Sequence, residues 1–124
     1  MIPEDSMIDN DEHLLAQLKK ETAGLLVMSE SDYPFEIIRW DGSTKITPEF
    51  LRSLTNEPAG SRVEEISLEQ FLASGPFERL ERFLREHLTD LKVYKVGTIS
   101  IPVYIVGKSP EGSWLGLSTR VVQT

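Results

Sequence analysis

Two segments of the chain have apolar residues at the spacing of an amphipathic helix. The first begins at Asp9 or Asn10, either of which can cap a helix, and Gly24 is placed to end it. The second begins at Pro76, and its apolar residues are separated by 3, 4, 4 and 3 positions: Phe77, Leu80, Leu84, Leu88 and Leu91. Acidic and basic residues four positions apart occupy its other face, which indicates exposure to solvent. We expect a helix in both segments, the second extending to residue 91.

Shorter patterns fill the rest of the chain. Thr47 followed by Pro48, and Ser67 followed three residues later by Gln70, are helix-start signals that predict two short helices. β-branched and aromatic residues predict strands over 35–40, 62–66, 93–96, 99–106 and 114–122. The predicted order is α-β-α-β-α-α-β-β-β. We expect a single α+β domain over 9–124, with helices packed over a mixed β-sheet, after a flexible lead-in over 1–8.

Composition narrows the classes of function. A chain of 124 residues with 40% hydrophobic and 27% charged residues matches one globular domain. Its 20 acidic and 13 basic residues give a net charge of −7, which argues against direct nucleic-acid binding and favours a basic partner. The absence of cysteine excludes disulfides and Cys-based zinc sites. With neither a secretory signal nor a membrane-length apolar run, we expect a cytoplasmic protein without membrane contact.

The residues give little support to an enzyme or a small-ligand carrier. Gly107-Lys108-Ser109 resembles the end of a phosphate-binding loop but lacks the upstream glycine that such a loop needs. A serine nucleophile needs a histidine in contact with it as a base. The sequence offers no evident base for Ser118 or Thr119. The chain has two histidines, and we expect His13 to be exposed and His87 to be packed or solvated. We therefore expect neither a catalytic centre nor a cofactor.

Two acidic features remain as candidates for binding. Glu30, Asp32 and Glu36 lie on or beside one turn, where their oxygens could bind magnesium or calcium or be solvated only. The strand pattern over 117–124 reaches Thr124, so a structured strand would hold the Thr124 carboxylate in a defined place. The alternative for the second feature is a frayed tail without function.

Several segments together resemble one family. Residues 24–36, GLLVMSESDYPFE, combine a Met-Ser-Glu-Ser turn with Tyr-Pro-Phe-Glu, and residues 116–124 read GLSTRVVQT. With these, the chain resembles the nuclease A inhibitor family of cyanobacteria over most of 13–124. Further matching segments are 40–43, 93–97, 103–107 and 110–112.

The resemblance implies a fold, a function and a site. The fold is a three-layer α/β/α sandwich of the PR-1-like type around the sheet. The function is inhibition of a sugar-nonspecific, magnesium-dependent DNA/RNA endonuclease by occlusion of its active site. In that arrangement Glu30 and Thr124 reach the catalytic centre, and Thr124 ligates the magnesium of the nuclease, so the inhibitor needs no metal of its own. Residues next to the two anchors are expected to make additional contacts with the nuclease: Ser29, Ser31, Asp32 and Gln123. We expect the protein to be a monomer when it is free.

The chain departs from the family's pattern in one place. Residues 73–77 pass almost directly into the second long helix, where the family's inhibitor has a longer acidic segment containing a tryptophan. We therefore expect part of the family's interface to be missing, which leaves the identity and affinity of the target nuclease open. The alternative function is a protein-binding module of the same fold whose partner is not a nuclease.

Overall fold

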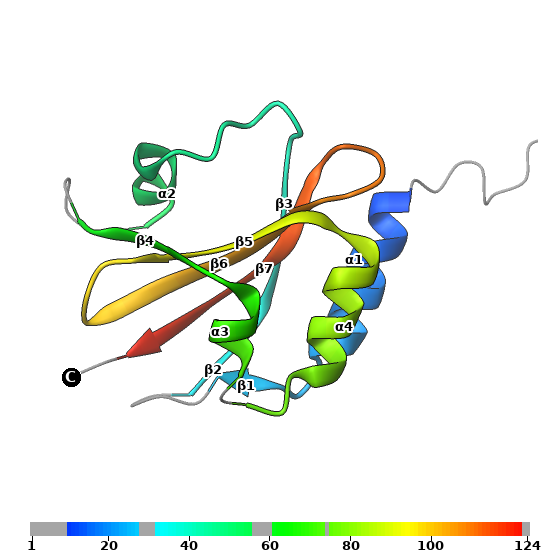
Figure 1. Cartoon of the computed structure of the whole chain (residues 1–124), viewed down its shortest axis with the longest axis horizontal. Helices are drawn as coiled ribbons and strands as arrows, with labels where there is room; N and C mark the ends of the chain where they lie inside the picture. Colours follow the sequence, from blue (N-terminus) through cyan, green and yellow to red (C-terminus); the bar gives the residue numbers. More distant parts are fainter. Residues whose placement is uncertain (1–9, 28–31, 56–60, 74, 123–124) are drawn as a thin grey trace, which may run out of the picture.

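The structure is a computed structural model that describes residues 10–27, 32–55, 61–73 and 75–122 (Figure 1). The predicted lead-in over 1–8 lies outside these residues and stays a prediction. In the described part of the chain, no helix is long and apolar enough to cross a membrane. The elements, in order, are α1 (Asn10–Thr22), β1 (Leu26–Val27), β2 (Tyr33–Pro34), β3 (Glu36–Trp40), α2 (Pro48–Ser53), β4 (Val63–Ile66), α3 (Leu68–Leu72), α4 (Glu78–His87), β5 (Thr89–Val96), β6 (Ser100–Lys108) and β7 (Trp114–Val122).

Five strands form one sheet in the order β3-β7-β6-β5-β4, and every neighbouring pair is antiparallel. The α+β class is therefore confirmed, but the predicted mixed sheet is wrong. Strands β5, β6 and β7 follow one another as hairpins and occupy the centre. Helix α2 lies between β3 and β4 in the sequence, and a helical crossover of this kind can join two parallel neighbours. Here β3 and β4 lie at opposite edges of the sheet instead.

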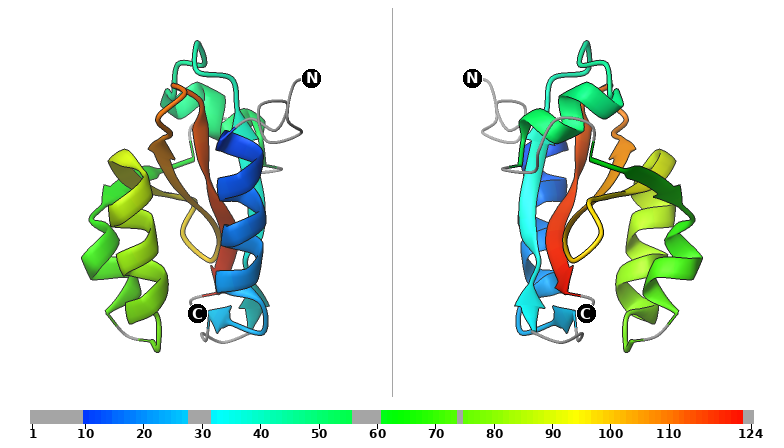
Figure 2. Two further views of the ribbon diagram at one scale, coloured as in Figure 1. Left: turned by 90° about the vertical axis from the view of Figure 1, so that its right-hand side faces the viewer. Right: turned by 90° about the vertical axis from the view of Figure 1, so that its left-hand side faces the viewer.

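Both faces of the sheet are covered by helices (Figure 2). Alternate strand residues point to opposite faces, so each face has its own core. The larger core joins Leu18 of α1 and Leu84 of α4 to strand residues such as Ile105. The smaller core, on the other face, joins Leu51 of α2 to Val96 and Tyr104. The assignment to the PR-1-like three-layer sandwich stays a prediction.

Most predicted helix boundaries agree with the structure. Gly24 follows α1 with φ +78°, a conformation that glycine adopts without strain. The hydroxyl oxygen of Thr47 accepts a hydrogen bond from the Phe50 N–H, and that of Ser67 accepts one from the Gln70 N–H. Both predicted caps therefore begin the short helices α2 and α3.

Two predictions of local structure are wrong. The second long helix ends at His87 rather than at residue 91, because Leu88 has extended backbone and Asp90 has a positive φ of 52°. Leu88 is buried and Leu91 packs against the same core, so the apolar spacing of a helix continues into strand β5. The predicted element order also lacks the two-residue strands β1 and β2. Two residues are too few to show the alternation of apolar and polar positions that marks a strand.

Candidate functional site

Strands β1 and β2 form the base of the acidic turn. They pair antiparallel, with Leu26 opposite Pro34 and Val27 opposite Tyr33. Val27 is buried in the larger core, which anchors the base to the rest of the molecule. Asp32 is exposed. The predicted site residues Ser29, Glu30 and Ser31 lie outside the described residues.

The second predicted anchor follows strand β7. This strand is paired with β6 along its whole length, from Trp114 opposite Lys108 to Val122 opposite Ser100. Gln123 and Thr124 lie outside the described residues. The predicted strand over 114–122 is confirmed, and its continuation to Thr124 stays a prediction.

The bases of the two anchors are bonded to each other. The β3–β7 ladder ends where Glu36 lies opposite Ser118. One residue further, the Thr119 hydroxyl donates a hydrogen bond of 3.0 Å to the Pro34 carbonyl oxygen. Figures 1 and 2 show the β1–β2 pair and the C-terminal end of β7 at the same end of the molecule. The described neighbours of Glu30 and those of Thr124 are thus brought together, although they are distant in sequence.

A hollow of about 290 Å³ lies beside this junction. Arg120 lines it, and its guanidinium donates a hydrogen bond of 2.5 Å from Nη1 to the Ser100 hydroxyl. Burial raises the pKa of Tyr104, and the positive charge of Arg120 opposes that shift. Tyr104 therefore stays neutral at physiological pH. The residues that line the hollow are Tyr33, Pro34, Glu36, Pro102, Tyr104, Ser118, Thr119 and Arg120.

Neither histidine contributes to this hollow. His13 is exposed on α1, and the half-buried ring of His87 packs against Phe83 with 4.4 Å between centroids. The Thr119 hydroxyl donates its hydrogen bond to a backbone carbonyl, not to a base. Among the described residues, no three histidine or acidic side chains are grouped to hold a metal ion. The cluster of Glu30, Asp32 and Glu36 stays a prediction, because Glu30 lies outside them.

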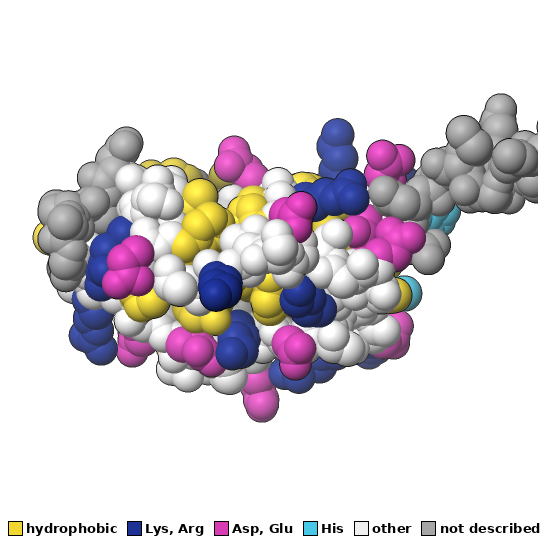
Figure 3. Space-filling model, turned by 90° about the horizontal axis from the view of Figure 1, so that it is seen from above, with side chains coloured by type: hydrophobic (Ala, Val, Ile, Leu, Met, Phe, Trp, Pro, Cys, Tyr) yellow, Lys and Arg dark blue, Asp and Glu magenta, His cyan; other side chains and the backbone are white. Residues whose placement is uncertain are grey.

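The surface on the α2 side carries acidic and basic side chains interspersed (Figure 3). The net charge of −7 is therefore not gathered as one acidic patch on that face. On α4, the i,i+4 pair between Arg85 and Glu81 is confirmed, at 3.0 Å. Arg79 pairs with Glu21 of the neighbouring helix α1, at 2.8 Å. Pairing of this kind is typical of a solvated face and not of a nucleic-acid-binding patch.

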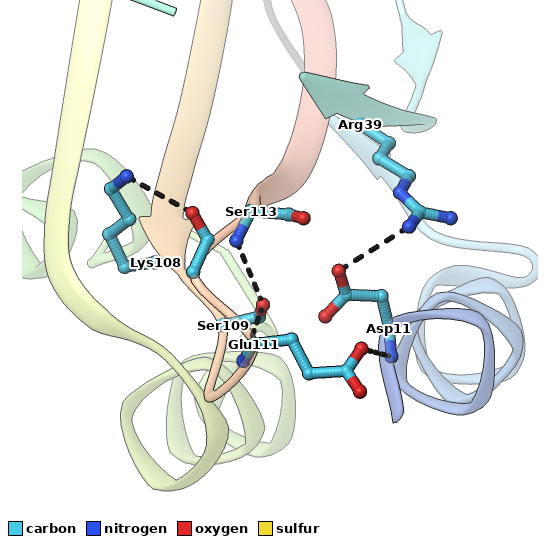
Figure 4. Close-up of polar contacts among 7 residues, drawn as sticks. Asp11, Arg39, Lys108, Ser109, Glu111 and Ser113 are labelled. Carbon is cyan, nitrogen blue, oxygen red and sulfur yellow. Dashed lines mark hydrogen bonds and ion pairs between the residues drawn. The ribbon is translucent and has the colours of Figure 1, made fainter. Parts of the chain in front are cut away.

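A polar cluster at the other end of the sheet was missed by the sequence analysis (Figure 4). The Asp11 side chain is only 1% exposed, and its Oδ2 lies 3.5 Å from Arg39 Nη2. The Asp11 N–H donates a long hydrogen bond of 3.4 Å to Glu111 Oε2. Glu111 of the β6–β7 turn thus satisfies an N–H in the first turn of α1, from 100 residues away in sequence. The sequence did not indicate the burial of Asp11, because an acidic residue in the first turn of a helix is ordinarily exposed.

Lys108 closes the same end of the molecule. Its Nζ donates hydrogen bonds to the carbonyl oxygens of Gly42, at 2.9 Å, and Gly112, at 3.1 Å. It also lies 4.6 Å from the centre of the Trp114 ring. The side chain therefore joins the loop after β3 to the β6–β7 turn, and it serves the scaffold rather than a phosphate-binding loop.

One known protein family matches this sequence. The family model described as nuclease A inhibitor-like protein matches residues 12–78 and 74–124. The two matched segments overlap at residues 74–78, where the chain enters α4. No individual curated protein matches the chain. Since the two segments cover nearly all of its length, the chain belongs to the nuclease A inhibitor-like family, which makes it a non-enzymatic, inhibitor-like protein.

Proposed function

We propose that the protein inhibits a sugar-nonspecific, magnesium-dependent DNA/RNA endonuclease by occluding its active site. Glu30 and the carboxylate of Thr124 are the two anchors, and Thr124 ligates the magnesium of the nuclease. The observation that carries the proposal is the hydrogen bond between Thr119 and Pro34. It supports a single binding end, because it joins the strand before Thr124 to the strand after Glu30.

Simple electrostatics favours this mode of binding. A nuclease cleft is basic and holds a hard metal ion, and a carboxylate oxygen can take the place of a phosphate oxygen there. The net charge of −7 increases the rate of encounter with a basic cleft. The chain next to each anchor is paired, and a paired neighbour lowers the conformational entropy that an anchor loses on binding.

The neighbouring residues Ser29, Ser31, Asp32 and Gln123 complete the proposed contact surface. Asp32, which is exposed next to β2, supports an acidic contact there. The short connection into α4 supports a smaller interface than the family's inhibitor uses, centred on the two anchors. The fold, with helices on both faces of its sheet, is proposed to be PR-1-like.

The test is a DNA-degradation assay with a magnesium-dependent nonspecific endonuclease, preferably one encoded in the same genome. We expect stoichiometric inhibition by the wild-type protein. Glu30→Ala and a Thr124 deletion should each weaken it by about 2–5 kcal/mol of binding free energy. Glu49→Ala on α2 removes the same charge away from the two anchors and should leave inhibition intact.

A second pair of variants isolates the position of the terminal carboxylate. Deleting Thr124 and adding one glycine after it both displace the carboxylate by one residue without changing net charge. Both should weaken inhibition. Unchanged inhibition by Glu30→Ala and by both C-terminal variants would contradict occlusion through these two anchors. No inhibition by the folded wild-type protein would favour the alternative of a binding module with a non-nuclease partner.

A further inference from the structure

Helix α2 leaves part of its face of the sheet open. Tyr104 of the smaller core belongs to this face, and Ser118 lies directly opposite it on β7. Arg120 is two residues further along β7 and therefore shares the face. Helix α2 has only six residues and lies toward one end of the sheet, whereas β2 lies at the other end (Figure 2). The hollow of about 290 Å³ lies beside β2, on the open part.

Arg120 brings a positive charge to this hollow, and most of its donors are unused. A guanidinium carries five N–H donors. Among the described residues, the hydrogen-bond partner of Arg120 is the neutral hydroxyl of Ser100. Arg79 and Arg85, in contrast, each form an ion pair with a glutamate. The half-buried charge of Arg120 is thus left without an anion by the described structure, and an anion that enters the hollow would compensate it.

Hydroxyl groups surround the guanidinium. Three residues that line the hollow with Arg120 carry hydroxyls without a hydrogen-bond partner in the described part of the chain: Tyr33, Tyr104 and Ser118. Burial raises the pKa of Tyr104, so its hydroxyl keeps its proton and can donate a hydrogen bond. Neutral donors beside a guanidinium are a set that binds an oxyanion through charge-assisted hydrogen bonds.

Glu36 restricts which oxyanion fits. It lines the hollow, lies opposite Ser118 in the β3–β7 register and is exposed. Its negative charge and the net charge of −7 repel a dianion such as phosphate about twice as strongly as a monoanion at the same place. A carboxylate carries one negative charge, and its two oxygens match the planar fork of a guanidinium. The hollow therefore suits a carboxylate better than a phosphate.

We propose that the hollow receives the carboxylate of an acidic side chain on the nuclease, an inference that rests on the proposed function. Arg120 pairs with this carboxylate, and the neighbouring hydroxyls complete its hydrogen bonds. The volume is large enough for a side-chain carboxylate and a few water molecules. The protein thus selects a nuclease that carries an acidic residue at the rim of its basic cleft. Net charge alone would not give this specificity.

The free protein tests the site without the nuclease. Acetate is the probe, and NMR of isotope-labelled protein follows the Nε–Hε group of Arg120, with sodium chloride at equal ionic strength as the reference. We expect a saturable shift with acetate and a weaker response to phosphate. Glu36→Gln removes the repelling charge and should tighten acetate binding about threefold, while Arg85, paired with Glu81, should not respond. Equal responses to acetate and chloride would overturn the proposed site.

Matched charge changes test the site in the complex. Arg120→Gln makes the protein one unit more negative, so long-range attraction to a basic cleft alone predicts faster association. Loss of a carboxylate contact predicts instead that inhibition weakens by about tenfold, mainly through faster dissociation. Arg85→Gln makes the same charge change on α4 and should leave inhibition intact. Unchanged or tighter inhibition by Arg120→Gln would overturn the inference and leave the proposed function standing.

A charge swap separates a direct contact from a structural role of Arg120. Arg120→Glu should weaken inhibition by about a hundredfold, and a lysine in place of one acidic residue at the rim of the nuclease cleft should restore most of it. Rescue by none of these lysine substitutions would overturn the inference. If the folded wild-type protein inhibits no nuclease, the proposed function fails and the acetate titration decides the site. A saturable response would then support the carboxylate site, and its absence would overturn it.

Discussion

The Thr119 hydroxyl lies 3.0 Å from the Pro34 carbonyl oxygen, and this hydrogen bond continues the contact between β7 and the chain before β3. The regular ladder ends at Glu36 and Ser118. The Thr119 side chain supplies the donor for the Pro34 carbonyl beyond the end of the regular ladder. The acidic turn, early in the sequence, and the final strand therefore share a base.

Removing that hydroxyl should loosen the shared base. Thr119→Val should lower the free energy of unfolding by about 0.5–1.5 kcal/mol, measured by urea denaturation. It should also weaken nuclease inhibition, because the turn and the final strand are then less firmly held together. Thr98→Val, on the exposed β5–β6 turn, is the matched control. Identical inhibition constants for the two variants would show that the hydrogen bond does not matter for binding.

The distal end of the molecule should behave differently. Lys108→Met removes two hydrogen bonds and a contact with the Trp114 ring, so we expect a loss of about 1–3 kcal/mol in stability. Inhibition per folded molecule should be unchanged, because Lys108 of β6 lies opposite Trp114, where β7 begins, and Thr119 lies nearer to the other end of β7. Inhibition is measured at a temperature where the variant is folded. If inhibition still falls by more than the small unfolded fraction explains, both ends of the molecule take part in binding.

Gly116 is expected to tolerate no larger side chain. It lies in the middle of β7, and a Cβ there would meet the backbone carbonyl of Ile105 on the neighbouring strand. Gly116→Ala should therefore destabilise the fold by about 1–3 kcal/mol, seen as a lower midpoint of thermal unfolding. Gly112→Ala, where a Cβ has open space but φ is +89°, tests backbone strain alone. A smaller loss for Gly116→Ala than for Gly112→Ala would contradict the close approach of the strands.

Two tyrosines, Tyr104, which is buried, and Tyr94, which is partly buried, predict a dependence of stability on pH. Burial raises the pKa of Tyr104 and of Tyr94 above the ordinary value of 10.0, and the charge of Glu65 adds to the shift at Tyr94. The unfolded state therefore releases these protons first. Their contribution to stability is complete below about pH 10 and is lost as the pH rises further. In Tyr104→Phe, the free energy of unfolding should fall less steeply between about pH 9 and 11 than in wild type. An equal slope in the two proteins would contradict burial of Tyr104 as the cause.

Much of the fold follows from local patterns, and the errors occur where tertiary contacts decide. Thr47 and Ser67 cap the helices that they were expected to begin. The apolar spacing through Leu88 and Leu91 predicted helix, but Leu88 is extended and both side chains reach the core as β5 begins. Hydrophobic spacing indicates which residues are buried, and it does not by itself distinguish a helix from a turn into a strand.

The candidate site was harder to predict than the fold. The acidic turn and the final strand were recognised from sequence motifs. Their common base depends on a hydrogen bond between residues 34 and 119, which no local pattern encodes. The burial of Asp11 was missed for a similar reason, because its partners Arg39 and Glu111 come from β3 and the β6–β7 turn. Strand order, which brought these residues together, was the part that sequence spacing left open.

The measurement that tests the central claim most directly is the dissociation constant of the complex with and without magnesium. Wild-type protein and the Thr124 deletion are titrated into the nuclease, first with magnesium and then with a chelator. Ligation of the metal by Thr124 predicts that magnesium tightens binding of the wild-type protein by at least tenfold and that the deletion gains much less. Equal dissociation constants for wild-type protein in the two conditions would contradict occlusion through the metal.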